Sequence, residues 1–461
     1  MILSQMQAVE ANPIAGSPSS SLGDWIFDNL EAIGLGILAV AAFFPAGAPT
    51  VSGTLDPNSY QSLWNLRLGP ANVFEIALLL FGLLWAIRAK LSPRPHHSAF
   101  EQRILFPAVL LIAAFQVVAL TTHLADAHYL PLDLERLLIP VAAYLVVTRC
   151  ASDLRQVRRF AIVVGWAIAL RALELVVVYG ILGSTQFGTS TGHTALLITE
   201  DVLLILFPLM LAWGGLVDGR QRLPAILGTL AFLAAVFAIN LISLRRGALL
   251  TISSALLLRA FTAGGRKIAM GFAALLVVAA IAVAAGPARS LVHDVGYTAA
   301  SSTLSTADAS SEQRVAEIES FKRNMHDAGW LVGNGIGVLW KAEVYAPVDA
   351  LSFGSGETEL TRIGWHVYGL DWLYKFGLLG ALAILWVSVA LFRRARSAYK
   401  SAGRDLRWLL LSAGICVPYF AIFVWTNPRI GLLLGIVIGI TVRCCDLAPG
   451  GSDSARPTAQ T

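Results

Sequence analysis

The sequence is short of charged residues. Asp, Glu, Lys and Arg make up 14% of its 461 residues, and 56% of the residues are hydrophobic. Soluble domains carry about 25% charged residues, so this shortage excludes an ordinary soluble domain. The net charge of +5 does not indicate nucleic acid as a partner, because Lys and Arg cluster in short stretches between apolar runs.

Cysteines and targeting signals are also scarce. The four cysteines, at positions 150, 416, 444 and 445, fall at the ends of predicted spans or inside one. We expect them to be reduced rather than part of a disulfide framework. Residues 1–26 have no basic segment followed by an apolar core, so we expect a cytoplasmic tail and not a signal peptide. No set of His, Cys and carboxylate residues has metal-ligand spacing, and we expect neither a metal nor a cofactor.

Long apolar runs dominate the remaining sequence. Runs of about 18 or more apolar residues predict membrane-crossing helices, and the basic connections between them are expected on the cytoplasmic side. We therefore expect an all-α polytopic membrane protein with about twelve transmembrane helices and both termini in the cytoplasm. The predicted spans are 27–46, 73–90, 103–121, 135–150, 160–182, 199–216, 224–244, 247–262, 267–286, 366–392, 406–425 and 429–443.

One connection is much longer than the others. Residues 287–365 carry ten Asp or Glu against six Lys or Arg, so they contain no inward signal and we expect them outside. Four apolar residues in this loop recur at helical spacing and predict an amphipathic helix: Val315, Ile318, Phe321 and Met325. The predicted regions are a tail (1–26), transmembrane helices 1–9 (27–286), the long external loop (287–365), transmembrane helices 10–12 (366–443) and a second cytoplasmic tail (444–461).

A histidine stands at the start of the tenth predicted span. In a continuous helix over 366–392, Gly377 and Gly380 would lie within about 40° of the direction of His366. Two glycines on that face would let another helix approach closely and hold the imidazole rigidly at the outer surface. An imidazole there could exchange a proton near neutral pH. The alternative is an interfacial histidine above ordinary small-residue packing.

Two further groups of charged residues are candidates for a site. Arg245 and Arg246 interrupt apolar sequence at a predicted external turn, against the usual charge bias. Arginine binds phosphate through two hydrogen bonds at once, so we expect a phosphate ligand; the alternative is a pair that extends to the interface. Arg171 and Glu174 lie inside the fifth span and share one helix face. They either join two spans or take part in substrate binding.

The order of these features resembles that of a known family. His366 is followed by Val367, nine further residues and the pattern Gly-x-x-Gly from Gly377 to Gly380. The Arg-Arg-Gly-Ala turn that begins at Arg245 precedes it, and Arg314, Gly335 and Gly337 lie between the two in the long loop. The pattern is similar to that of the O-antigen ligase and Wzy-type polysaccharide polymerase superfamily of bacterial envelope glycosyltransferases. Val367 departs from it, because that family prefers a polar residue after the histidine.

The resemblance implies a GT-C-like enzyme of the bacterial inner membrane with a periplasmic active face. The implied donor is an undecaprenyl-diphosphate-linked oligosaccharide, and the acceptor glycan is a lipid-linked repeat or lipid A-core. Membrane lipids, chain-length regulators and export proteins are the further partners. Arg246 and Arg314 would hold the diphosphate as it leaves, and His366 would accept the proton of the attacking hydroxyl. The residues expected to bind substrate around them are Arg245, Arg171, Glu174, Gly335, Gly337 and Tyr368.

Three functions remain open at this stage. We favour a polymerase, because the first external loop (47–72) is longer than a minimal turn and Val367 departs from the ligase-like pattern. An O-antigen ligase is the first alternative. A transporter or flippase is the second; it would use charges near the bilayer midplane and broken helices, and the pair Arg171 and Glu174 suits it.

Overall fold

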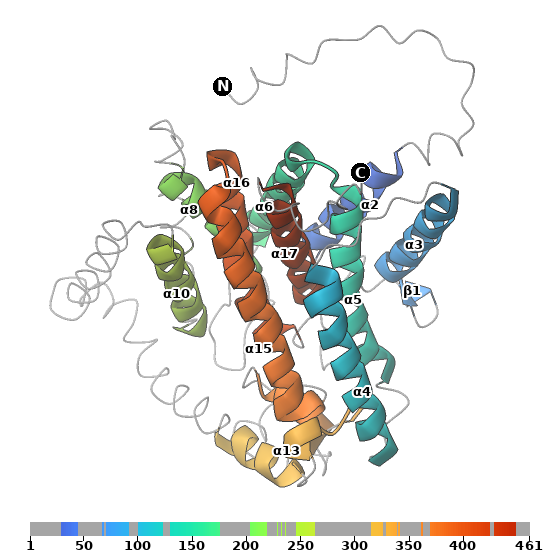
Figure 1. Cartoon of the computed structure of the whole chain (residues 1–461). Coiled ribbons are helices and arrows are strands. Elements are labelled where there is room, and N and C mark those ends of the chain that lie inside the picture. Colours follow the sequence, from blue (N-terminus) through green and yellow to red (C-terminus); the bar gives the residue numbers. More distant parts are fainter. Residues whose placement is uncertain are drawn as a thin grey trace, which may run out of the picture.

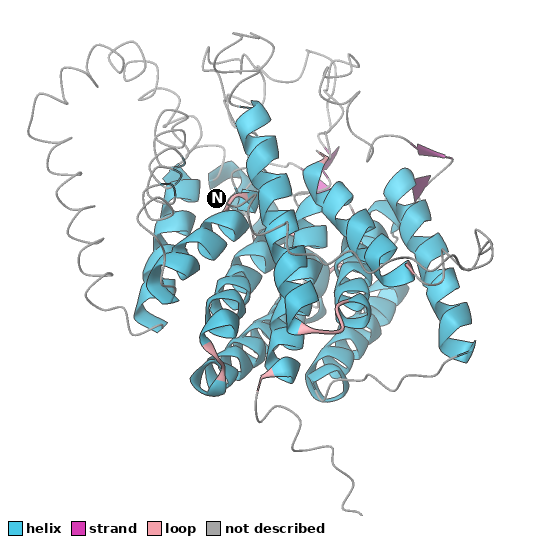
Figure 2. Ribbon diagram, turned by 90° about the horizontal axis from the view of Figure 1, so that it is seen from above, coloured by secondary structure: helices cyan, strands magenta, loops and turns pink. Residues whose placement is uncertain are grey.

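The structure is a computed structural model, and the part of the chain that it describes is almost entirely helical (Figures 1 and 2). Two pairs of two-residue antiparallel strands are the exceptions: β1 (Arg67–Leu68) with β2 (Ala71–Asn72), and β3 (Trp340–Lys341) with β4 (Thr361–Arg362). The described residues are 29–44, 67–68, 71–91, 100–122, 130–175, 203–218, 228, 232, 236, 246–262, 315–325, 329–338, 340–341, 361–362, 369–424 and 428–448.

The helices follow the apolar runs of the sequence. Every predicted span overlaps a described helix except 224–244, where isolated positions are described, and 267–286, which lies outside the described residues. Residues 315–324 are also helical. The other helices are α2 (Leu30–Phe43), α3 (Val73–Leu91), the π-helix η3 (Glu101–Leu105), α4 (Phe106–Thr122), α5 (Leu130–Cys150), α6 (Leu154–Leu175), α8 (Leu206–Asp218), α10 (Arg246–Thr262), α13 (Gly329–Val332), α15 (Leu370–Ser401), α16 (Arg404–Phe423) and α17 (Pro428–Leu447).

The helices have the length and surface of a membrane protein. Among the described helices, four stretches are long and apolar enough to cross a membrane: Glu101–Val118, α15, α16 and α17. Large apolar side chains also point outward from the bundle, and Leu79 and Leu110 are 70% and 68% exposed. Leucines stay exposed in this way when lipid, and not water, surrounds them. The chain is therefore a membrane-embedded helical protein.

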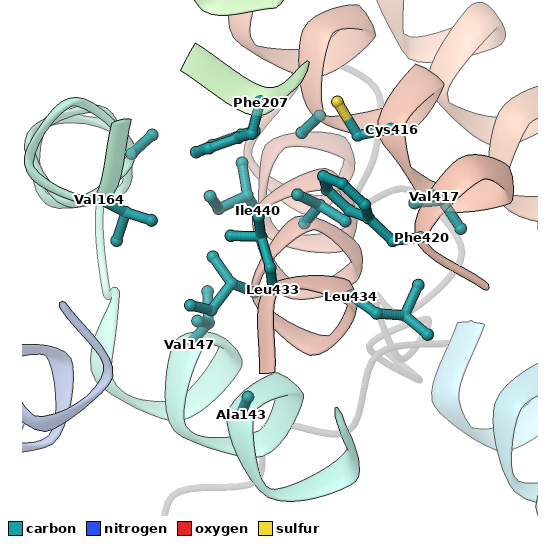
Figure 3. Packing of buried hydrophobic residues seen from close by; sticks show 14 of the residues in the cluster. Ala143, Val147, Val164, Phe207, Cys416, Val417, Phe420, Leu433, Leu434 and Ile440 are labelled. Carbon is teal, nitrogen blue, oxygen red and sulfur yellow. The ribbon is translucent and has the colours of Figure 1, made fainter. Parts of the chain in front are cut away.

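Helix α17 occupies the centre of the bundle (Figure 3). Leu433 and Ile440 lie among side chains from α5, α6, α8 and α16, including Val147, Val164 and Phe207. Nearly every residue from Arg429 to Cys445 is buried. A helix that is apolar on all sides needs partners on all sides, and α17 is the element around which the others pack.

Three glycines on α17 allow α5 to approach closely. Gly431, Gly435 and Gly439 recur every four residues and so lie on one face of the helix. A Cβ on Gly435 would meet the backbone carbonyl of Pro140, and one on Gly439 would meet the Val147 side chain at 2.7 Å. Small residues at this spacing are typical of tight helix pairs in membranes, where close backbone contact supplies the packing energy.

The two ends of the bundle differ. The basic end, as we name it, carries the turn between α15 and α16; there the buried Glu101 accepts hydrogen bonds from Tyr144 (2.8 Å) and Arg149 (3.1 Å). The opposite end, named the loop end, carries α13 and helical residues 315–324 against the start of α15 (Figure 1).

The helix over 315–324 packs differently from our prediction. Phe321 and Met325 are buried and contact Tyr374 of α15, as the apolar spacing predicts. Val315 and Ile318 are 60% and 37% exposed, so their assignment to the packed face is wrong. The buried face instead runs through smaller residues such as Ala316, which is 6% exposed and follows Val315 directly.

Candidate functional site

Helix α15 is interrupted near the loop end. The residue before it, Gly369, has φ 98°, and Gly377 inside it has φ 63° and ψ −170°. The first seven residues, 370–376, therefore form a short helix that is separate in direction from the rest. Our prediction of one continuous helix over 366–392 is wrong, because both glycines adopt positive φ, which favours glycine over other residues.

The two glycines of the Gly-x-x-Gly pattern have different surroundings. A Cβ on Gly377 would meet the backbone of Leu331 and Gly333, so a loop and not a long helix approaches at this point. The space beside Gly380 is filled by the Phe376 side chain of the same helix. The close approach of another transmembrane helix, which the spacing suggested, is therefore wrong for Gly380, and at Gly377 its place is taken by the end of α13.

A glycine-rich loop fits against this break. After α13, Gly333, Gly335 and Gly337 all have positive φ, at 81°, 97° and 76°. The alternation turns successive amide groups toward neighbouring elements. The Asn334 amide donates to the Tyr374 carbonyl (2.7 Å), and the Gly335 amide donates to the Lys375 carbonyl (3.1 Å). The loop thus supplies donors to carbonyls that lie just before the break in α15.

The next two amides of the loop bind side chains of α4 and α5. The Ile336 amide donates to Gln116 Oε1 and the Gly337 amide to Asp133 Oδ2, both at 2.7 Å. Gln116 also donates through Nε2 to the Lys375 carbonyl at 3.0 Å. Four consecutive amides, 334–337, are therefore occupied by α4, α5 and α15, and the loop joins the three helices at the loop end.

A buried ion pair lies at the centre of this junction. Lys375 Nζ and Asp133 Oδ2 are 2.5 Å apart, and both side chains are 1% exposed. Arg136 NH1 is 3.9 Å from the other oxygen, Asp133 Oδ1, and Asp371 is buried one turn before Lys375. Two carboxylates and two cations balance one another here. Burial of such charges is tolerated only when they are paired and hydrogen-bonded, which makes the junction sensitive to the loss of any one of them.

Two of the three predicted catalytic residues, Arg314 and His366, lie outside the described residues, and so do Arg245 and Tyr368, which were predicted to bind substrate. Arg246 is the first residue of α10, and its side chain also lies outside them. The elements that adjoin these positions are described. The described helix packed on α15 begins at Val315, the residue after Arg314, and Gly369 precedes α15 three residues after His366.

The start of α10 and the start of α15 lie at the same end of the bundle. Trp372 of α15 donates to the Ala421 carbonyl of α16 at 2.7 Å, so these two helices are antiparallel and α16 ends at the loop end. Ser254 of α10 contacts Tyr419 of α16 at 2.8 Å, whereas the later residue Arg259 lies near the earlier part of α16. Helix α10 is thus antiparallel to α16 and begins at the loop end.

The predicted pair inside α6 is present as an ion pair within one helix. Arg171 NH1 donates to Glu174 Oε2 at 2.8 Å within one helix. Arg171 is 1% exposed, and its Nε and NH2 have no hydrogen-bond partner among the described residues. Only this contact within α6 is described, so a role of the pair in joining two spans stays a prediction. Its role in substrate binding stays a prediction.

Sequence reasoning missed Gln116, Asp133 and Lys375. The signal for Lys375 was available, since an ionisable residue inside an apolar span is by default a functional candidate. The pairing of Lys375 with Asp133 could not be predicted, because 242 positions separate the two residues in the sequence. Gly335 and Gly337 were predicted to bind substrate, and the structure gives both amides protein acceptors. No family model and no curated protein matches the chain, so the resemblance stays a prediction.

Proposed function

We propose that the chain is a membrane glycosyltransferase that acts at its loop end. It transfers a glycan from an undecaprenyl-diphosphate carrier to a sugar hydroxyl, and polymerisation of lipid-linked repeats is the favoured form. One observation supports the proposal most: α10, which opens with Arg246, and α15, which follows His366, both begin at the loop end. The helix that follows Arg314 packs there too.

The reaction follows from the chemistry of the three side chains. His366 accepts the proton of the acceptor hydroxyl as its oxygen forms a bond to the anomeric carbon. The bond from that carbon to the diphosphate oxygen breaks, with inversion at the carbon. Arg246 and Arg314 bind the diphosphate and stabilise the negative charge that it gains. No nucleotide sugar takes part, because the energy of the linkage is already stored in the lipid-linked donor.

Substitution of the base tests the proposal directly. We expect His366→Ala and Arg246→Ala to abolish transfer by purified protein given lipid-linked repeat, while membrane insertion is unchanged. His97→Ala is the matched control, because it removes another histidine from a predicted cytoplasmic connection. Full transfer by either of the first two variants would refute the assignment. Products longer than one repeat identify a polymerase, and transfer that requires lipid A-core identifies a ligase.

A transporter or flippase is the second candidate, and the break in α15 favours it. Transporters bind their substrates at discontinuous helices with charged groups nearby, and Lys375 lies two residues before Gly377. The break is close to the loop end, however, and its neighbouring carbonyls are bonded to protein groups. Proteoliposomes separate the two functions: a transporter moves labelled lipid-linked glycan across the bilayer without forming a new sugar bond.

A further inference from the structure

The carboxylate of Asp133 binds two chain segments that lie on either side of His366 in the sequence. Its Oδ2 accepts from Lys375 Nζ at 2.5 Å and from the Gly337 amide at 2.7 Å. Lys375 lies in the short helix that starts after Gly369, and Gly337 lies three residues before strand β3. One buried atom of α5 therefore fixes the loop and the start of α15 relative to each other.

The pairing of β3 with β4 holds the chain on the N-terminal side of His366. Trp340 of β3 pairs with Arg362 of β4, so the strand that follows Gly337 also holds the residue from which the chain continues toward His366. His366 itself lies outside the described residues. Its chain is tied at Arg362 on one side and at Gly369 on the other, and a stretch of this length spans at most about 25 Å. Gly369 precedes the helix that Asp133 binds, and Arg362 pairs with the strand that follows the loop that Asp133 binds.

We infer that Asp133 is a positioning residue, which with Lys375 sets the place from which His366 acts. This inference rests on the proposed glycosyl transfer. The inference follows from the low stabilisation expected of a buried ion pair. An apolar pair of similar volume at these two positions would stabilise the bundle as well or better. What an apolar pair would lack is an acceptor for the Gly337 amide. The charge thus specifies one arrangement of loop and helix.

The basic end provides a matched control. Glu101 is as buried as Asp133, at 1% exposed, and it also has two partners, Tyr144 and Arg149. It contacts neither the loop at 329–338 nor α15 through these bonds. Loss of its charge should therefore weaken the fold without moving the proposed base, so Glu101→Gln separates loss of stability from loss of position.

The test compares kcat, KM and amide exchange in Asp133→Asn, Glu101→Gln and the double variant D133L/K375M. Because misplacement of a reacting group by about 1 Å can cost up to about 100-fold in rate, we expect Asp133→Asn to lower kcat by about 10- to 100-fold. KM should stay within about twofold, since donor binding is left to other residues. Amides 334–337 should exchange faster with deuterium in this variant, and Glu101→Gln should change neither quantity.

The double variant keeps the inference testable where Asp133→Asn does not fold. D133L/K375M removes both charges, so we expect it to fold and still to lose kcat. A kcat equal to that of Glu101→Gln in either variant, or unchanged exchange at 334–337, overturns the inference. His366→Ala in the same assay separates the two hypotheses: if that variant is active, the proposed function fails, and the exchange data alone then decide whether Asp133 fixes the loop.

Discussion

The contact between Gly435 of α17 and Pro140 of α5 gives the sharpest prediction for stability. A Cβ at position 435 would press on the Pro140 carbonyl and lie 2.8 Å from the Ala143 Cβ. Those atoms belong to helix backbone or lie directly on it, so they cannot move without moving α5. Overpacking of this kind costs about 1–3 kcal/mol. Alanine gains up to about 1 kcal/mol over glycine in a helix, which offsets part of that cost. We expect Gly435→Ala to be destabilising by about 1–2 kcal/mol.

Gly82 in α3 is the control for this prediction. It is also inside a helix, and a Cβ there would meet nothing within 4 Å. Gly82→Ala therefore gains the same helix propensity without the overpacking, and it should be neutral or stabilising.

The four native cysteines provide the assay for both variants. All are free and buried, so a thiol-reactive fluorophore in detergent reports the temperature at which the core opens. The midpoint of Gly435→Ala should fall a few degrees below that of Gly82→Ala. Equal midpoints would show that α5 and α17 do not pack through this glycine face.

Three other variants test separate parts of the structure with the same assay. Arg429 donates to carbonyls at the end of α2, including that of Phe43 at 3.3 Å, so Arg429→Met should cost about 2 kcal/mol and lower the midpoint. Gly377→Ala should cost at least about 1 kcal/mol, because alanine disfavours a positive φ, and an unchanged midpoint would argue against the break in α15. Glu319→Gln should leave the midpoint unchanged at neutral pH. Lys322 lowers the pKa of Glu319, but both side chains are exposed, and this small contribution would be lost only as the pH falls through that lowered pKa.

The helices were predictable because lipid imposes length and apolarity on each crossing segment. The predicted span 406–425 overlaps α16, and 429–443 overlaps α17, to within a few residues at most ends. The same rules say nothing about backbone direction inside a span. Gly377 was read as a small residue for packing, yet its positive φ depends on a loop more than 40 residues earlier in the chain. Periodicity alone cannot tell these two uses of glycine apart.

The candidate site was less predictable than the fold, for a related reason. Lys375 is a charge within an apolar span, a signal that our sequence analysis did not use, and its pairing with Asp133 depends on how helices pack in three dimensions. The repeat of Gly431, Gly435 and Gly439 carried a recognisable signal, since glycines four apart in an apolar helix predict close packing. That signal identifies the face of α17, and it leaves the partner helix open.

The central position of α17 has a consequence for how the protein is made. Helices α2, α5, α6, α8 and α16 surround it, and every one of them leaves the ribosome before it does. Until α17 enters the bilayer, its neighbours can contact one another, but the grooves that it will fill face lipid. Assembly of the core is therefore a late event in biogenesis, and a nascent chain that lacks this helix would present its unfinished interfaces to membrane quality control.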